Sequence, residues 1–310
     1  LKMGLGTNHV VQSEVNTAGF IPEVWSDEII AGYKKNLVAA NLIKTMNMKG
    51  KKGDVVHFPA PARGSASTKA AETEVTLIQE SGTEKTVTIN QHYEYSRLIE
   101  DFAEVQALTS LRRFYTDDAG YALATRVDTD VLSLGRQSQA GSGSAAYDKG
   151  FLGGDGSTFY VAASNNESAI TDAGFRRAIQ RLDDQDVPMD NRNFVIPPVA
   201  RNVMMGLSRF TEQAFTGEAG TANTIRNGQI GDIYGIKVYV STNVDTTNGS
   251  GAARVCLLFH PEFGVLVEQL GVRVQTQYKQ EHLGTLLTAD TLYGTGELRD
   301  TSAVALIVPA

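Results

Sequence analysis

The residue types that carry catalytic or metal-binding chemistry are few in this chain and lie far apart. No two histidines have the His-x-x-x-His spacing by which one helix face holds a metal. The five histidines are His9, His57, His92, His260 and His282. The chain has a single cysteine, Cys256, so an internal disulfide is excluded. This cysteine lies in an apolar run that is typical of a buried strand. This pattern predicts no zinc site.

Other short stretches resemble parts of known motifs without completing one. Residues 206–210, Gly-Leu-Ser-Arg-Phe, lack the second glycine of a nucleophile elbow and lie in a predicted helix. The glycine pairs at 141–143 and 154–156 complete no P-loop, dinucleotide fingerprint or EF-hand, and we interpret both as flexible linkers. The aspartates between 183 and 190 favour a solvated helix end, with a calcium site as the alternative. We therefore expect no enzyme and no cofactor.

Composition and charge narrow the class of protein further. The chain has 310 residues, of which 42% are apolar, enough for one large or two modest domains. Its formal net charge of −7 argues against a surface that grips nucleic-acid phosphates. Its apolar runs are shorter than the ~20 residues that span a membrane, and no signal-peptide core opens the sequence. We expect a globular chain without a membrane partner.

A long polar hairpin is predicted in the first third of the chain. A strand at 54–58 leads into the Ala/Ser-rich stretch 59–73, which has no hydrophobic pattern. Two further strands, 74–80 and 84–95, flank the turn signal Ser81-Gly82-Thr83. The sequence therefore predicts an extended projection with few apolar residues of its own.

One face of the last predicted strand is apolar and the other is polar. The apolar face consists of Val87, Ile89, Tyr93 and Tyr95. An isolated ribbon of this kind is marginal in water, because so little burial does not offset the entropy lost on ordering. We therefore predict that the core of the hairpin is completed by a neighbouring subunit.

A long helix is predicted directly after the hairpin, over residues 98–137. Apolar side chains recur there at spacings of three and four, and no proline interrupts them. About 36 residues at 1.5 Å each would give a rod of roughly 54 Å. Seven acidic and four basic residues lie between Glu100 and Arg136, so we expect an acidic exposed face.

The second half of the chain has a mixed α/β pattern and follows a glycine-rich break at 135–156. A helix capped near Thr171 precedes a strand at 193–198 and a short helix around 203–207. A polar, glycine-punctuated loop follows at 215–231. The later predicted strands are 235–241, 254–260, 264–278 and 302–308.

The order of these parts resembles the major capsid proteins of tailed bacteriophages, which share the HK-ninety-seven-like shell fold. Residues 182–198 and 231–244 are also similar to local stretches of podovirus-type shell proteins. The resemblance implies an α+β fold with an N-terminal arm, an E-loop β-hairpin, a long spine helix in a peripheral domain, and an α/β axial domain. On this chain the parts would be the arm 1–48, the E-loop 49–99, the peripheral domain 100–159, the axial domain 160–261, the peripheral return strands 262–284, and a C-terminal segment 285–310 returning to the axial domain.

The resemblance implies a structural role without catalysis. Copies of the chain would form hexamers and pentamers of an icosahedral shell that encloses double-stranded DNA. The expected partners are other copies, scaffolding and portal proteins, a cement protein as a further candidate, and DNA contacted non-specifically. The expected location is the virion capsid, assembled in the cytoplasm of the host bacterium.

Three groups of contact residues follow from the resemblance. The E-loop interface would use Arg63, Lys69, Glu72, Glu74, Glu84 and Lys85, and the axial-loop interface would use Phe215, Glu218, Asn223, Arg226 and Asn227. The acidic inner face of the spine helix would comprise Asp117, Asp118, Asp128 and Asp130. Such a face suits an inner wall, because a basic lining would bind packaged DNA. Some family members crosslink an E-loop lysine to another subunit, and Lys69 lies in that region.

Other classes of protein stay open at this point. An encapsulin, the shell of a bacterial compartment for cargo enzymes, would share the fold, although the arm and the local sequences favour a phage protein. An α/β hydrolase or glycan-binding enzyme with a hairpin lid would need a catalytic constellation that these residues do not supply. A tail or tube protein would be richer in β-strands than this pattern.

Overall fold

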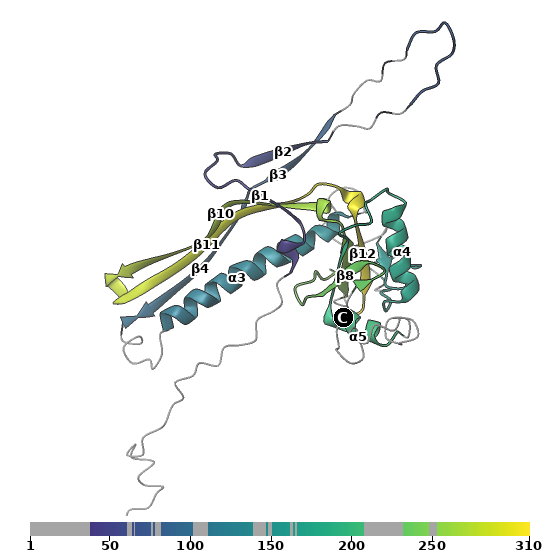
Figure 1. The fold of residues 1–310 in the computed structure, drawn as a ribbon. Coiled ribbons are helices and arrows are strands. Elements are labelled where there is room, and N and C mark those ends of the chain that lie inside the picture. The colour runs from purple at the N-terminus through teal and green to yellow at the C-terminus, as the bar shows by residue number, and fades with distance from the viewer. Residues whose placement is uncertain are drawn as a thin grey trace, which may run out of the picture.

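The fold consists of two main sheets, one long helix that runs along the four-stranded sheet toward the six-stranded one, and a projecting hairpin (Figure 1). It comes from a computed structural model. The structure describes residues 38–60, 64, 66–75, 77, 82–101, 111–138, 147, 151–161, 164, 166–207, 232–247 and 253–310.

The helices and strands follow one another in the order expected of an α+β chain. The described α-helices are α3 (Leu111–Ser133), α4 (Asp172–Asp183) and α5 (Pro198–Met205). The described strands are β1 (Lys44–Asn47), β2 (Val55–Ala60), β3 (Thr83–Thr88), β4 (Gln91–Glu100), β5 (Leu152–Gly153), β6 (Asn193–Ile196), β7 (Asp232–Ile233), β8 (Ile236–Val240), β9 (Arg254–Phe259), β10 (Gly264–Lys279), β11 (Gly284–Glu297) and β12 (Ala303–Val308). The described short 3-10 helices are η1 (Ala39–Asn41), η2 (Leu134–Gln137), η3 (Pro261–Phe263), η4 (Gln280–His282) and η5 (Asp300–Ser302).

The six-stranded sheet has the order β5-β12-β9-β6-β8-β7 and is buried on both faces. Its strand β12 is wholly apolar and wholly buried, because alternate side chains enter two different cores. One set packs with α4 through Phe175 and Leu182, and the other faces the end of α3. The predicted cap of α4 is confirmed, since the Thr171 hydroxyl accepts a hydrogen bond from the amide of Gly174.

The four-stranded sheet has the order β1-β10-β11-β4 and carries α3 along one face (Figure 1). Ala119 and Leu123 of the helix pack on Ala289 of β11, beside Tyr93 and Tyr95 of β4. The hydroxyl of Tyr95 donates a hydrogen bond to the Asp118 carboxylate at 2.9 Å. Helix and sheet are therefore joined by apolar contact along their length and by polar bonds at the margin.

The C-terminal half of α3 passes from this sheet into the space beside the six-stranded sheet. Its residues Val131 and Leu132 join one core with Leu266 of β10 and Leu257 of β9. Within that core, Asp128 is 1% exposed and its carboxylate accepts bonds from the amides of Val38 and Ala39 and from the Asn243 side chain. One buried carboxylate thus ties α3 to segments on both sides of it.

The observed hairpin differs in pairing from the predicted one. Strand β3 pairs with β2 in the register Val55↔Thr88 to Ala60↔Thr83, and the described parts of 74–80 lie in no strand. The turn predicted at 81–83 is therefore wrong, and the connection between the paired strands is much longer. The buried face is confirmed, but Val87 and Ile89 rest on Val265 and Val267 of the same chain. At its base, the hairpin lies on its own subunit.

The start predicted for the long helix is also wrong. Residues 98–100 belong to β4, where Ile99 is buried and Leu98 is exposed, as in a strand that has one face against the body. Residues 102–110 lie outside the described residues, and α3 gives way to η2 after Ser133. The described helix has 23 residues.

Two boundaries predicted in the second half also change. Strand β11 stays beside β10 in the four-stranded sheet, so the chain enters the six-stranded sheet at Ala303 and not at residue 285. The stretch predicted as a linker around Gly154 is tightly packed, since a Cβ on this glycine would collide with the backbone of Ser168 and the two residues after it. Asp155 accepts hydrogen bonds from Ser157 and Thr158, which hold its pKa well below the ordinary value although partial burial opposes them.

We predict that Asp128→Ala lowers the free energy of unfolding by ~3 kcal/mol, because two buried amides and an amide side chain lose their acceptor. Urea denaturation monitored by circular dichroism measures this change. The control is Asp117→Ala on the same helix, where the exposed carboxylate should matter by less than ~0.5 kcal/mol. Equal effects of the two variants would contradict this role of Asp128.

Candidate assembly interface

The base of the hairpin crosses directly over β11, where two glycines of that strand leave room for it. A Cβ on Gly294 would lie 2.6 Å from the carbonyl oxygen of Thr88, and one on Gly296 would collide with the Val87 side chain. No larger residue fits either position without displacing β3. The crossing fixes where the hairpin leaves the body of the molecule.

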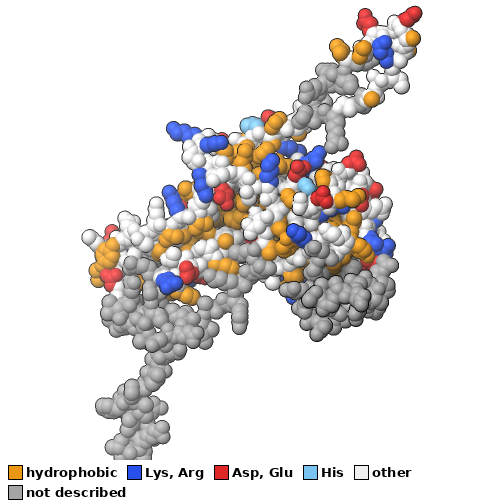
Figure 2. Space-filling model, viewed as in Figure 1, with side chains coloured by type: hydrophobic (Ala, Val, Ile, Leu, Met, Phe, Trp, Pro, Cys, Tyr) orange, Lys and Arg blue, Asp and Glu red, His pale blue; other side chains and the backbone are white. Residues whose placement is uncertain are grey.

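The far end of the hairpin has exposed apolar and charged side chains on the same short segment (Figure 2). Val75 is 69% exposed and Leu77 is 90% exposed. The predicted interface residues Lys69, Glu72 and Glu74 are exposed in the same segment. Arg63 lies outside the described residues. The projection therefore presents unburied apolar surface together with charge.

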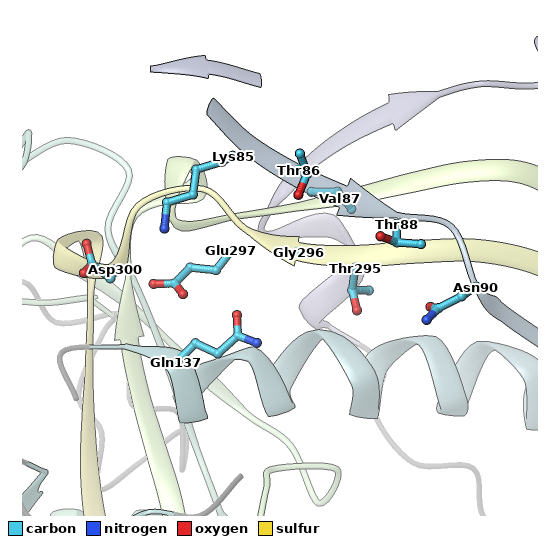
Figure 3. A pocket seen from close by; sticks show the side chains of 10 residues that line it. All are labelled: Lys85, Thr86, Val87, Thr88, Asn90, Gln137, Thr295, Gly296, Glu297 and Asp300. Atoms are coloured by element: carbon cyan, nitrogen blue, oxygen red, sulfur yellow. The ribbon is translucent and has the colours of Figure 1, made fainter. Parts of the chain in front are cut away.

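The other two predicted E-loop residues lie near the base, on β3. Glu84 is exposed, and its carboxylate is 3.2 Å from the Nδ1 atom of His57 on β2. Lys85 points into a pocket between β3, β11, η2 and η5 (Figure 3). The two groups of E-loop residues therefore occupy different surroundings and are not brought together in one subunit.

This pocket has a volume of about 430 Å³ and a mostly polar lining. Figure 3 shows Lys85, Gln137, Glu297 and Asp300 around one space. The remaining lining residues are Thr86, Val87, Thr88, Asn90, Thr295 and Gly296. The pocket thus joins the hairpin, the four-stranded sheet, the end of the α3 region and the turn into β12.

Glu297 is the residue in this pocket whose ionisation is most disturbed. Burial, together with the smaller effect of the Asp300 carboxylate, raises the pKa of its carboxyl to about 7, and the Lys85 ammonium opposes both. Its Oε1 atom is buried and has no hydrogen-bond partner among the described residues. The sequence offers no signal for this, because an isolated glutamate at the end of a strand is indistinguishable from a surface residue.

A second polar cluster lies on the four-stranded sheet and is fully paired. The guanidinium of Arg273 donates two bonds, of 2.7 and 2.9 Å, to the Asp290 carboxylate, and His92 lies 3.2 Å from that carboxylate. The bonds from Arg273 are the main reason why the pKa of Asp290 lies below its usual value. Since the three residues lie on β10, β11 and β4, the cluster joins adjacent strands.

The predicted acidic face of the long helix is only partly exposed. Asp117 is exposed and Asp118 is partly buried, where it accepts the bond from Tyr95. Asp128 and Asp130 are 1% and 7% exposed, so placing them on an exposed face was wrong. Their position follows from helix geometry, because residues 128, 131 and 132 share the face that enters the core. Asp130 accepts a bond from the Tyr293 hydroxyl.

Three further predictions concern the axial loop, the acidic stretch after α4 and the membrane. All five axial-loop residues lie outside the described residues: Phe215, Glu218, Asn223, Arg226 and Asn227. In the acidic stretch after α4, Asp183 forms an ion pair with the buried Arg192 at 2.7 Å, so this carboxylate has a structural partner. None of the helices in the described part of the chain is long and apolar enough to cross a membrane.

The architecture defined by these elements is that of a shell-forming capsid subunit. The fold matches a chain of Mycobacterium phage Che8 at 25% identity and a TM-score of 0.72, over 93% of this chain and 97% of that chain. It matches the capsid structure of the cyanophage P-SCSP1u at 18% identity and a TM-score of 0.74, over 98% and 97%. The mature capsid of bacteriophage PhiM1 matches at 13% identity and a TM-score of 0.71, over 93% and 92%.

Residues 93–306 match the model of the phage capsid protein family, and the chain belongs to that family. No curated protein sequence matches it. The HK-ninety-seven-like fold predicted from the order of elements is confirmed, and so is the class of structural major capsid protein. The encapsulin and enzyme alternatives receive no support.

We predict that Gly294→Ala destabilises the subunit by ~1–3 kcal/mol, because the added methyl group meets the backbone of the hairpin base. Gly120→Ala is the matched control, since a Cβ on this helical glycine has open space around it. It should stabilise α3 by ~0.5–1 kcal/mol. If both substitutions shift the midpoint of urea unfolding in the same direction, close packing at the crossing is not what requires Gly294.

We predict that Glu297→Gln changes how stability depends on pH. Since the pKa of Glu297 is raised from 4.5 to about 7 in the folded chain, its contribution to stability is complete below pH 4.5 and is lost as the pH rises through 7. The variant should therefore be more stable than the wild type at pH 8, by ~1–2 kcal/mol after allowance for its partial exposure. Urea unfolding at pH 5 and pH 8 measures the difference, and an unchanged gap between the two proteins would contradict it.

Proposed function

We propose that the chain forms hexamers and pentamers of an icosahedral shell around double-stranded DNA, with each hairpin lying across an adjacent subunit. The observation that carries this proposal is the contrast along the hairpin. Its base is buried on the same chain through Val87 and Ile89, whereas Val75 and Leu77 near its far end contact no core.

The physical argument concerns the cost of ordering the projection. Each ordered residue loses about 1–2 kcal/mol of backbone entropy, and an apolar side chain left in water returns none of it. Covering the Val75 and Leu77 side chains would return roughly 1.5–3 kcal/mol each. A neighbouring copy is the natural cover in a family whose members build shells from many copies of one chain.

Further partners belong to the same proposal. The arm predicted at 1–48 is shortened, because η1 and β1 belong to the body of the subunit, and the residues before them would tie neighbouring capsomers. The loop around residues 215–231 would meet its equivalents at capsomer centres. Scaffolding, portal and cement proteins would act during assembly in the host cytoplasm, and the chain itself would catalyse no reaction. Lys69 is exposed, as a crosslinking lysine must be, and the crosslink stays a prediction.

The burial of Asp128 and Asp130 reduces the set of aspartates on α3 that could face packaged DNA. Asp117 and the exposed part of Asp118 are the predicted aspartates that a DNA-facing surface would use. Their negative charge would keep DNA from binding, as expected for a genome that must move during packaging and ejection. The proposed acidic surface of α3 therefore includes two of the four predicted aspartates.

Electron microscopy of the expressed protein tests the proposal directly. Closed shells or rings of five and six subunits are the expected result, with addition of a scaffolding protein as the second condition. A chain that stays monomeric at high concentration under both conditions would contradict the proposed assembly.

We predict that the double substitution Val75→Ser and Leu77→Ser weakens assembly without unfolding the subunit. Both side chains are exposed in the single chain, so the free energy of unfolding should change by less than ~0.5 kcal/mol. Sedimentation should show fewer or more fragile shells. Met189→Ser is the control, because Met189 is 74% exposed on a different part of the molecule and should leave assembly unchanged. Loss of subunit stability in the double variant would show instead that the hairpin is packed within one chain.

A further inference from the structure

The pocket at the base of the hairpin has a charge imbalance that the chain does not correct by itself. Two carboxylates, Glu297 from β11 and Asp300 from η5, share it with one ammonium group, that of Lys85. The influence of Lys85 on Glu297 is weaker than that of burial and weaker than that of Asp300. The space between these side chains is open in Figure 3.

Three buried carboxylates among the described residues have partners within the chain. Asp245 receives two bonds, of 2.6 and 2.7 Å, from Arg136, and Asp290 receives two from Arg273. Asp128 receives bonds from two amides and an asparagine. Glu297 differs from these three, because its buried Oε1 atom accepts no hydrogen bond among the described residues, a property that it shares with Oε2 of Glu167. A buried acceptor without a donor carries the cost of its lost hydration, which a donor arriving from outside the chain would recover.

We propose that this pocket is a socket for a lysine or arginine side chain of a second copy of the chain, with Glu297 as the residue that receives it. The proposal rests on the proposed self-assembly. The incoming cation would donate to the Glu297 carboxylate, and oxygens of Gln137, Asn90 and Thr295 would accept its remaining N–H groups. A volume of about 430 Å³ is sufficient for the head of either side chain.

A second copy is a better occupant than a metal ion. Among the described residues there is no group of three or more histidine, cysteine, aspartate or glutamate side chains placed to hold a metal. The ammonium group of Lys85 in the same pocket would repel a divalent ion about twice as strongly as it repels the single charge of a lysine or arginine at the same distance. The pocket lies at the base of the hairpin that is proposed to bridge subunits, so a side chain of another copy is the occupant that the proposed assembly supplies.

Binding in the socket would be coupled to a proton. The titratable groups that face Glu297 are Lys85 from β3 and Asp300 from η5, while η2 and β11 contribute the uncharged Gln137 and Thr295. Because the pKa of Glu297 is about 7 in the free subunit, most copies carry the proton at pH 6. A docked cation favours the ionised form, so association releases this proton and strengthens as the pH rises through 7.

The test compares the wild type with Glu297→Gln, which has nearly the same shape and cannot ionise. The measured quantity is the subunit concentration at which rings or shells form, by light scattering and analytical ultracentrifugation at pH 6 and pH 8. The wild type should assemble at a concentration about fivefold or more lower at pH 8 than at pH 6. At pH 8 the variant should need about tenfold more protein than the wild type, and its own pH difference should be smaller.

Two comparisons separate this effect from a loss of folding. Urea unfolding should show that the Glu297→Gln subunit is at least as stable as the wild type at pH 8, so weaker assembly cannot come from unfolding. Glu281→Gln, which removes an exposed carboxylate in η4 outside the pocket, should assemble like the wild type. Equal loss of assembly in both variants would mean that overall charge, and not the socket, is responsible.

The outcomes also distinguish the socket from the proposed function. If the wild type assembles and Glu297→Gln assembles at the same concentrations with the same pH dependence, the socket is wrong and shell formation stands. If the wild type forms neither rings nor shells with or without scaffolding protein, the proposed assembly fails and the socket fails with it.

Discussion

The rest of the structure depends on the way in which the second half of α3 is held between the two sheets. An amphipathic helix on one sheet needs one apolar face, but this helix must contact two sheets and the segment before β1. Val131 and Leu132 provide the buried apolar contacts of the helix. The Asp128 carboxylate fixes the orientation of the helix, since its hydrogen bonds to η1 and Asn243 can form in only one arrangement. The relative position of the two sheets therefore follows from the helix.

A fixed body gives the hairpin a fixed origin. Strand β3 rests on β11 where Gly294 and Gly296 leave room for it, and Val87 fills the space beside the second glycine. Beyond this crossing the β2–β3 ladder ends at Ala60 and Thr83, and Val75 and Leu77 stand in solvent. A rigid base with an uncovered end suits a part that must reach a defined place on a neighbouring molecule. In a protein that acts alone, the entropy lost on ordering such a hairpin would not be offset by burial of its apolar side chains.

The sequence predicted the class of fold and most strands of the second half, because buried strands such as β9 and β12 carry continuous apolar runs between clear turn signals. It failed where long-range pairing decides the outcome. Residues 74–80 have a strand-like composition, but β3 pairs with β2, from Ala60↔Thr83 to Val55↔Thr88, so the paired residues lie 23 to 33 positions apart in the chain. Helical period alone could not show that Asp128 and Asp130 turn inward, since their burial depends on partners over 85 residues away. Glu297 was missed because its surroundings come from four separate elements.

The buried acids of this chain show a division between what one subunit completes and what it leaves open. Asp128, Asp245 and Asp290 are stabilised by donors from the same chain, and each of them joins elements within the body. Glu297 lies where the body meets the projecting hairpin, and its buried Oε1 atom has no donor among the described residues, as is also true of Oε2 of Glu167. What distinguishes Glu297 is that it lines a pocket beside the base of the hairpin, where a side chain of a second molecule can reach it. The unpaired carboxylate of Glu297 on β11 and the uncovered apolar side chains of the hairpin thus belong to neighbouring parts of the subunit, and other copies of the chain would satisfy both.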